Sequence, residues 1–72
     1  MISYNKLWHL LVDRNLKRTQ LCEKAGISSS TLAKLGKNEI VSLEVLERIC
    51  DYLGCDVGDI LCFREGDVIE DE

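Results

Sequence analysis

The residues of this chain best suited to bind a metal ion or to act as nucleophiles are four cysteines and one histidine. They are Cys22, Cys50, Cys55, Cys62 and His9. A structural zinc site needs such ligands at close spacing, usually as Cys-x-x-Cys pairs, and no two of these cysteines form one. We therefore interpret the cysteines as small core residues and expect no metal site.

The chain offers no set of side chains for covalent or acid-base catalysis. A nucleophile needs an activating base within reach, and phosphate chemistry needs a glycine-rich loop. The sequence has a single histidine, no such loop, and carboxylates scattered over faces that should be solvated. We predict that the protein is not an enzyme and uses no cofactor.

Length and composition favour one small helical domain. A chain of 72 residues buries only about 60% of its unfolded surface, which leaves no room for a large cleft. Zero prolines and five glycines provide few turn formers, so we predict an all-α fold. No apolar run could span a bilayer and no signal-peptide pattern opens the chain, so we expect a cytoplasmic protein with reduced thiols and no membrane contact.

The charge is unevenly spread along the chain. Residues 1–40 carry seven Lys or Arg and three Asp or Glu, a net charge of +4. Residues 41–72 carry two basic and ten acidic residues, a net charge of −8, so the whole chain has −4. The basic half can face an anionic partner while the acidic end limits non-specific binding. We expect residues 64–72 to form a flexible acidic tail, and both a solvated and a regulatory role stay open.

Apolar residues at three- and four-residue spacing predict a compact domain of five short helices over residues 1–63. The first helix should cover about residues 3–14. Ser3 is suited to cap its start, and Asn15 is suited to end it because asparagine tolerates left-handed backbone.

The last two helices are marked by their caps. Ser42 is a good N-cap for the fourth helix and Gly54 closes it. Asp56, with Asp59 three residues on, is typical of a capping box and predicts a fifth helix that runs to Phe63. The buried stripe of the fourth helix should consist of Leu43, Leu46, Ile49, Cys50 and Leu53.

Residues 18–36 have the pattern of two short helices that meet at a tight turn, which is helix-turn-helix geometry. Gly26 can supply the positive φ of the turn, and Ser28 can cap the second of these helices, at about residues 28–35. A loop should follow at residues 36–38. The pattern alone is not specific, because many helical hairpins contain a glycine turn.

Three blocks of sequence occur in a defined order. They are LCEKAGIS at residues 21–28, STLAKL at residues 30–35 and SLEVLERICDYLGCDVGDIL at residues 42–61. In this order they resemble the Cro/Xre, or phage lambda repressor-like, helix-turn-helix proteins, and the resemblance covers roughly residues 3–63. It implies a five-helix DNA-binding domain whose third helix lies in the major groove, usually as a dimer on a palindromic or repeated site.

Carried over by position, the resemblance assigns two groups of DNA contacts. The base-facing residues are Ser29, Ser30, Ala33 and Lys34. The phosphate contacts are Lys17, Arg18, Thr31, Lys37 and Asn38. Lys34 can reach guanine O6 and N7 and should supply most of the discrimination between bases, about 1–3 kcal/mol. The alternative is a solvated surface charge for each cation and a helix-start preference for each serine.

The chain departs from the family pattern at three places. The family usually has Thr-Gln at the start of its second helix, where this chain has Lys17 and Arg18. Cys22 replaces the usual alanine, and Gly36 and Asn38 replace the Glu and Gly that commonly follow the recognition helix. These departures bear on the helix crossing and on the path of the loop.

We therefore predict a small, sequence-specific, DNA-binding transcriptional regulator, with duplex DNA as its partner and a homodimer as its working form. Tyr52 and Phe63 are candidates to line a dimer face. The alternative is an antitoxin-like or adaptor module on the same fold, with a protein partner and weak or no DNA binding of its own. We expect no small-molecule ligand.

Overall fold

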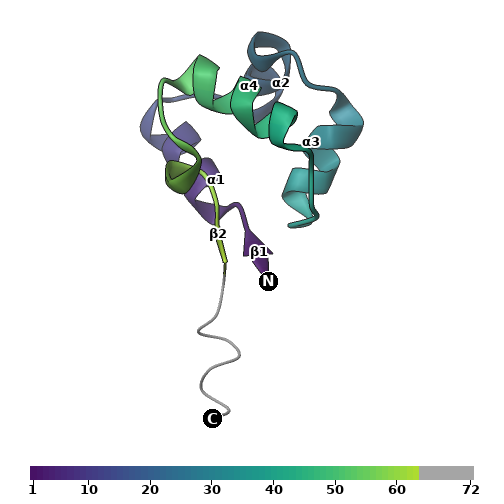
Figure 1. Cartoon of the computed structure of the whole chain (residues 1–72). Coiled ribbons are helices and arrows are strands. Elements are labelled where there is room, and N and C mark those ends of the chain that lie inside the picture. The colour runs from purple at the N-terminus through teal and green to yellow at the C-terminus, as the bar shows by residue number, and fades with distance from the viewer. Residues whose placement is uncertain (64–72) are drawn as a thin grey trace.

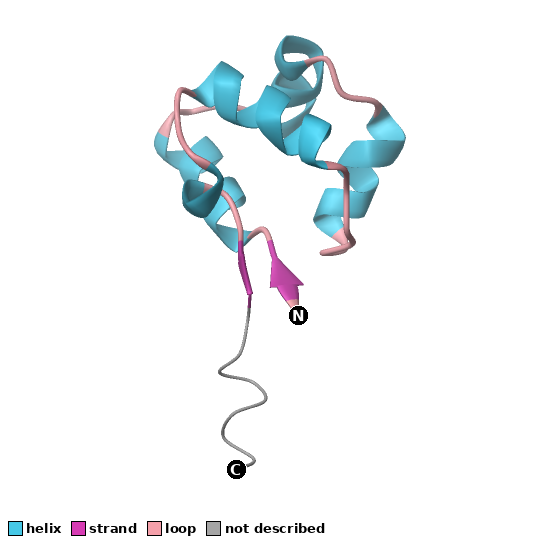
Figure 2. Cartoon of the chain, in the orientation of Figure 1, coloured by secondary structure: helices cyan, strands magenta, loops and turns pink. Residues whose placement is uncertain are grey.

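The computed structural model describes residues 1–63, and the expected acidic tail at residues 64–72 lies outside them. The fold is mostly helical (Figures 1 and 2). Its elements are β1 (Ile2–Ser3), α1 (Asn5–Asp13), α2 (Arg18–Ala25), α3 (Ser29–Gly36), α4 (Leu43–Leu53), the 3₁₀ turn η1 (Val57–Asp59) and β2 (Cys62–Phe63). None of the helices in this range has the length and apolar character that a membrane crossing requires.

One apolar core joins all four helices. Every helix contributes at least one fully or nearly fully buried leucine, and α2 packs against both α3 and α4. Burial of each large aliphatic side chain is worth about 1.5–3 kcal/mol, so the core holds the short helices in place where their own propensity would not. The buried apolar residues are Tyr4, Leu7, Leu11, Leu21, Ala25, Leu35, Leu46, Ile49, Leu53 and Ile60.

The predicted caps of α3 and α4 are confirmed. The Ser28 hydroxyl accepts a hydrogen bond from the Thr31 N–H at 3.1 Å, and the Ser42 hydroxyl accepts one from the Val45 N–H at 3.3 Å. Each hydroxyl satisfies one backbone donor that the first turn of a helix leaves without a partner.

The predicted left-handed positions are confirmed as well. Positive φ occurs at Asn15, two residues after α1 (58°), and at the C-caps of α2 and α4, Gly26 (73°) and Gly54 (68°). Asn38, two residues after α3, also has positive φ (59°). The expected loop at residues 36–38 begins one residue later than predicted, because Gly36 is the last residue of α3.

The predicted start of the first helix is wrong. Ser3 does not cap α1 but lies in β1, fully buried and paired with Cys62 of β2. The residue at the N-cap is Tyr4, with φ −108° and ψ 20° and no side-chain cap. The Ser3 hydroxyl does accept a hydrogen bond from the N–H of Asn5, the first residue of α1, at 3.3 Å. Ser3 therefore satisfies a backbone donor of α1 although it lies in β1.

The predicted fifth helix is also wrong, and the chain is therefore not purely α. The cap is present, since Asp59 Oδ2 accepts a hydrogen bond from the Asp56 N–H at 3.0 Å. The helix stops after the single turn η1, because residues Cys62–Phe63 pair antiparallel with Ile2–Ser3. The two ends of the described chain therefore meet in a two-stranded sheet (Figure 2).

Leu43 does not belong to the buried stripe of α4. It is the first residue of the helix and is 80% exposed, whereas Leu46, Ile49 and Leu53 are buried as predicted and Cys50 is half-buried. The prediction for Leu43 is wrong because, within residues 1–63, no element covers this end of α4.

Candidate nucleic-acid interface

The segment α2-turn-α3 presents one face of α3 to solvent. Leu35 is buried and anchors the helix to the core, with Leu32 half-buried beside it. The four predicted base-facing positions are on the opposite side and are all exposed: Ser29, Ser30, Ala33 and Lys34. A helix held by one apolar edge with a small, polar outer face is suited to enter a groove.

The hydroxyl groups at the start of α3 differ in how free they are to form hydrogen bonds with DNA. Ser28 Oγ lies 3.0 Å from Ser30 Oγ and also donates a hydrogen bond to Thr31 Oγ1 at 3.0 Å. The side chains of Ser30 and Thr31 are therefore tied into the cap of α3. Within residues 1–63, Ser29 has no such hydrogen bond, so its hydroxyl is free to meet a base edge.

The cations of α2 and α3 are brought together by Arg18. A Cβ atom added at Gly36 would lie 3.6 Å from Arg18 Nη1, so this guanidinium lies against the last turn of α3. Lys34 occupies the same turn and Lys37 follows the helix directly, while Lys17 is the N-cap of α2 beside Arg18. Arg18 of α2 therefore lies beside the turn of α3 that carries Lys34. We call these two residues and their neighbours along the chain the basic edge (Lys17, Arg18, Lys34 and Lys37).

Trp8 of α1 fixes the position of Arg18. The Arg18 guanidinium carbon lies over the indole ring, 3.8 Å from its centroid. Trp8 is half-buried and packs against the core, so the ring is a firm platform for an exposed arginine. A cation over an indole face is attracted by the ring quadrupole, by about 0.5–1 kcal/mol at an exposed site.

The basic edge is not neutralised by carboxylates within residues 1–63. The one ion pair found there joins Arg48 to Glu44 on α4, with 2.9 Å between Nη2 and Oε2. Because the cations of the edge keep their full charge toward solvent, they can neutralise the phosphates of a nucleic acid without first breaking an ion pair.

Asn38 has a structural role that leaves its amide NH₂ group for the predicted phosphate contact. Its Oδ1 accepts a hydrogen bond from the Tyr4 N–H at 3.1 Å, and the Tyr4 hydroxyl donates one to the Glu39 carbonyl at 2.8 Å. These bonds hold the loop after α3 against the start of α1. Burial raises the pKa of Tyr4, so the phenol keeps its donating proton. A phosphate contact from Asn38 would have to use its amide NH₂ group.

Arg48, which was not among the predicted site residues, supports the turn between α2 and α3. Its Nη1 donates a hydrogen bond to the Gly26 carbonyl at 2.8 Å, while its Nη2 pairs with Glu44. The spacing of Glu44 and Arg48 is a signal for an intrahelical pair. Nothing in the sequence indicates the contact with Gly26, which is 22 residues away.

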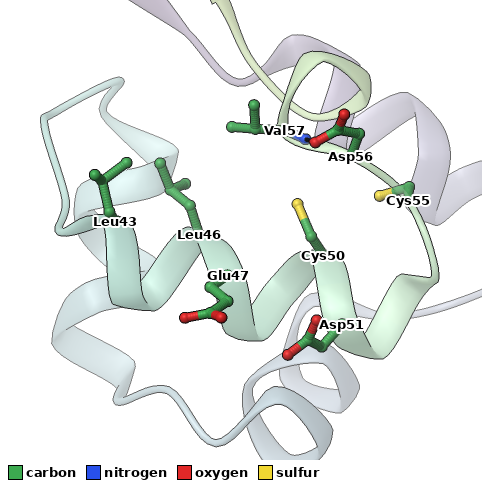
Figure 3. A pocket seen from close by; sticks show the side chains of 8 residues that line it. All are labelled: Leu43, Leu46, Glu47, Cys50, Asp51, Cys55, Asp56 and Val57. Carbon is green, nitrogen blue, oxygen red and sulfur yellow. Dashed lines mark hydrogen bonds between the residues drawn. The ribbon is translucent and has the colours of Figure 1, made fainter.

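The cysteines form no metal site in the described part of the chain, and no group of three metal-ligating side chains occurs there. Cys50 and Cys55 line one hollow beside α4, together with Asp56 and Val57 (Figure 3). Burial, followed by the neighbouring Cys55, raises the pKa of Cys50 to about 11. This thiol therefore stays protonated at neutral pH and is a poor nucleophile and metal ligand. All four cysteines are half-buried, so they are less buried than the core role predicted.

Known proteins are similar to this chain in sequence and, for one solved structure, in fold. Residues 6–65 match the model of the Cro/C1-type HTH (helix-turn-helix) DNA-binding domain. YozG of Bacillus subtilis (strain 168), an HTH-type transcriptional regulator, is 40% identical over 57 residues, which is 76% of this chain and 68% of that protein. The crystal structure of the transcriptional regulator VanUg, form II, has 62% identity and a TM-score of 0.83, and the match covers 85% of this chain and 81% of that one. This chain belongs to the family of Cro/C1-type HTH DNA-binding domains.

Proposed function

We propose that this protein is a sequence-specific regulator of transcription that binds duplex DNA with α3 in the major groove. The family is one of non-enzymatic DNA-binding domains. The observation that carries the finer proposal is that the Arg18 guanidinium of α2 lies against the last turn of α3, the turn that carries the exposed Lys34. Cations at and beside a small polar helix face fit a helix that enters a groove lined by phosphates.

Base reading is assigned to the exposed face of α3. Lys34 is the one long donor there and fits guanine O6 and N7, while the Ser29 hydroxyl can donate or accept at several base edges. Ala33 offers its methyl group to a thymine methyl. Ser30 is held by the cap and is left with accepting capacity. Discrimination therefore rests mainly on Lys34.

Phosphate binding is assigned to Lys17, Arg18, Thr31, Lys37 and Asn38. Arg18 is the strongest of these because Trp8 holds its guanidinium in place, so little side-chain freedom is lost on binding. These contacts set the register of the protein on the duplex and carry no sequence information.

A homodimer is the proposed working form. One α3 reaches only a few base pairs, and a weak set of base contacts needs a second half-site to become specific. Two copies related by a two-fold axis would read a palindrome whose half-sites are about 34 Å apart, one turn of the duplex.

Binding to a labelled, mixed-sequence duplex of about 30 base pairs tests the electrostatic part of this proposal. Affinity should fall steeply between about 50 and about 200 mM salt, with a log-log slope of about −0.9 for each phosphate neutralised. Lys34→Gln should weaken binding. Lys24→Gln is the matched control, because Lys24 is an exposed lysine in the last turn of α2, outside the basic edge.

The alternative, a protein-interaction module on the same fold, predicts a different result. Such a module would show no salt-dependent binding to the duplex even at low salt. Equal effects of Lys34→Gln and Lys24→Gln would also contradict the proposed use of α3, because both changes remove one positive charge.

A further inference from the structure

The lysines and arginines of residues 1–63 differ in whether their charged groups already have a partner. Those of Lys6, Arg14 and Arg48 each donate a hydrogen bond to a backbone carbonyl, and Arg48 also pairs with Glu44. Within the described chain, none of the other five has a hydrogen bond or an ion pair at its charged group. Four of these five make up the basic edge, and the fifth is Lys24. In the described part of the chain, the basic edge is therefore the largest group of cations still available to an anion.

The C-terminal segment, residues 64–72, carries the opposite charge. It has one arginine and five carboxylate side chains, so its net side-chain charge of −4 equals in size the +4 of the basic edge. The carboxylates are those of Glu65, Asp67, Glu70, Asp71 and Glu72. Surfaces of opposite charge attract each other, and a covalent link between them raises their effective concentration. We infer that the C-terminal segment binds the basic edge of its own chain and competes there with the phosphates of DNA.

The fold brings the start of the C-terminal segment close to the end of α3. Phe63 of β2 pairs with Ile2 of β1, and two residues further on the Tyr4 N–H donates to Asn38 Oδ1 at 3.1 Å. In Figure 1 the end of β2 and the loop after α3 lie toward the same end of the fold. Paired strands are about 4.8 Å apart and an extended residue spans at most about 3.6 Å, so Phe63 lies within about 20 Å of Asn38.

The C-terminal segment is long enough to reach the basic edge from there. Its nine residues can extend about 30 Å. Lys37 adjoins Asn38, and Lys34 lies about one helical turn, 5.4 Å, before it on α3. Glu70 and Asp71, near the far end of the segment, are therefore within reach of Lys34.

The apolar groove beside β2 is a second surface near the start of the segment. It is lined by Met1, Ile2, Ile40, Val41, Leu43, Leu46, Val57, Leu61 and Phe63. None of these side chains is ionisable, so the groove offers no partner for a carboxylate. The segment has only Val68 and Ile69 as large apolar residues, against five carboxylates, and its composition therefore favours the basic edge.

The consequence for DNA binding rests on the proposed function. Carboxylates on the basic edge occupy the cations that phosphates need, so the segment lowers the affinity for every duplex by the same factor. Non-specific binding is already weak, with a dissociation constant of about 10⁻⁴–10⁻⁶ M, and is the first to become negligible. The C-terminal segment would thereby clear the protein from non-specific DNA and leave it on its tightest sites.

Amide NMR of the full chain without DNA tests the contact itself. We compare Glu70→Gln with Asp71→Asn, made together, against the matched control Glu47→Gln with Asp51→Asn. Each pair of changes removes two negative charges, and the control residues are exposed on α4, outside the basic edge. The resonances of Lys34 and its neighbours in the basic edge should shift in the first variant and stay unchanged in the control.

Three results would overturn the inference. One is equal shifts, or none, in the two variants. Another is shifts confined to the apolar groove, at residues such as Ile40 and Leu43. The third is a set of shifts that grows when protein concentration rises about tenfold, because a contact within one chain does not depend on concentration.

Duplex binding tests the competition. At about 100 mM salt, the affinity for a mixed-sequence duplex should rise about fivefold in Glu70→Gln with Asp71→Asn and less than about twofold in the control. The difference should shrink as salt screens the contact. Equal gains in the two variants would show that only overall charge matters and would overturn the inference.

Failure of the proposed function has a separate signature. Shifts at Lys34 in the first variant alone, without salt-dependent duplex binding by either variant or the wild type, would support the contact and contradict DNA reading. Salt-dependent binding that Lys34→Gln weakens, with no difference between the two carboxylate variants, would support DNA reading and overturn the inference.

Discussion

At the scale of single residues, the pairing of Arg18 with Trp8 makes a prediction of its own. The proposed function gives Trp8 a role in DNA binding only through Arg18. Arg18→Ala should therefore weaken binding to a mixed-sequence duplex about tenfold and Trp8→Leu about threefold. The double variant should be no weaker than Arg18→Ala alone. Trp8→Phe keeps an aromatic face and serves as the control.

Fluorescence anisotropy at fixed salt measures these affinities, and circular dichroism verifies that each variant is folded. If the losses from Arg18→Ala and Trp8→Leu simply added, Trp8 would be a packing residue with no part in holding the guanidinium.

The raised pKa of Cys50 predicts how stability depends on pH. In the unfolded chain the thiol ionises near its ordinary pKa of 9.0, and in the folded chain near 11. The folded state therefore binds the proton more tightly, and this stabilisation is complete below pH 9 and lost as pH rises toward 11. Thermal melting should show Tm falling over this range. Cys50→Ala should have a shallower fall, and a fall of the same steepness would refute the assignment.

Tyr4 contributes to the same pH profile with the same sign. Burial raises its pKa above 10.0, so its ionisation also opposes folding at high pH. The comparison of Cys50→Ala with the wild type isolates the thiol, because both proteins keep Tyr4.

At the scale of elements, the turn between α2 and α3 depends on backbone conformation. Gly26 has φ 73°, and a Cβ atom there would meet Arg48 Nη1 only at an ordinary 3.8 Å. Gly26→Ala should therefore cost about 1–2 kcal/mol of unfolding free energy through left-handed strain alone. Gly58→Ala is the control, with nothing within 4 Å of its Cβ, and should change stability by less than about 0.5 kcal/mol.

Urea unfolding at one fixed protein concentration measures both glycine variants, because any dimer would otherwise couple stability to concentration. A Gly26→Ala protein as stable as Gly58→Ala would show that the turn tolerates an L-residue, against the observed geometry.

The elements that sequence predicts correctly are those with local signals. Ser28 and Ser42 bond to N–H groups three residues ahead, and Gly26 and Gly54 end helices by their own backbone freedom. The elements that the sequence does not predict are β1 and β2, which form only by pairing with each other from opposite ends of the described chain. Ser3 looks like a cap because its partner, Cys62, is 59 residues away, and the same pairing ends the expected fifth helix.

At the scale of the whole molecule, the sequence predicts which residues of α3 are exposed. It does not predict the long-range contacts that hold α3 in position. The outer face of α3 follows from helical spacing and from Leu35 as its anchor. The contacts that hold the helix-turn-helix segment in place link residues far apart in the sequence. Arg18 of α2 contacts Trp8 of α1, and Arg48 of α4 bonds to Gly26 at the end of α2. Such contacts arise from packing, which residue spacing does not encode.

Duplex DNA binding through α3 is the central claim, and selection from a randomised duplex pool at moderate salt tests it most directly. The wild-type chain should enrich a palindrome with half-sites about one helical turn apart. Lys34→Gln should relax the preference at one guanine in each half-site, and Lys24→Gln should select the same palindrome as the wild type. No enriched sequence, together with no binding at low salt, would contradict the account.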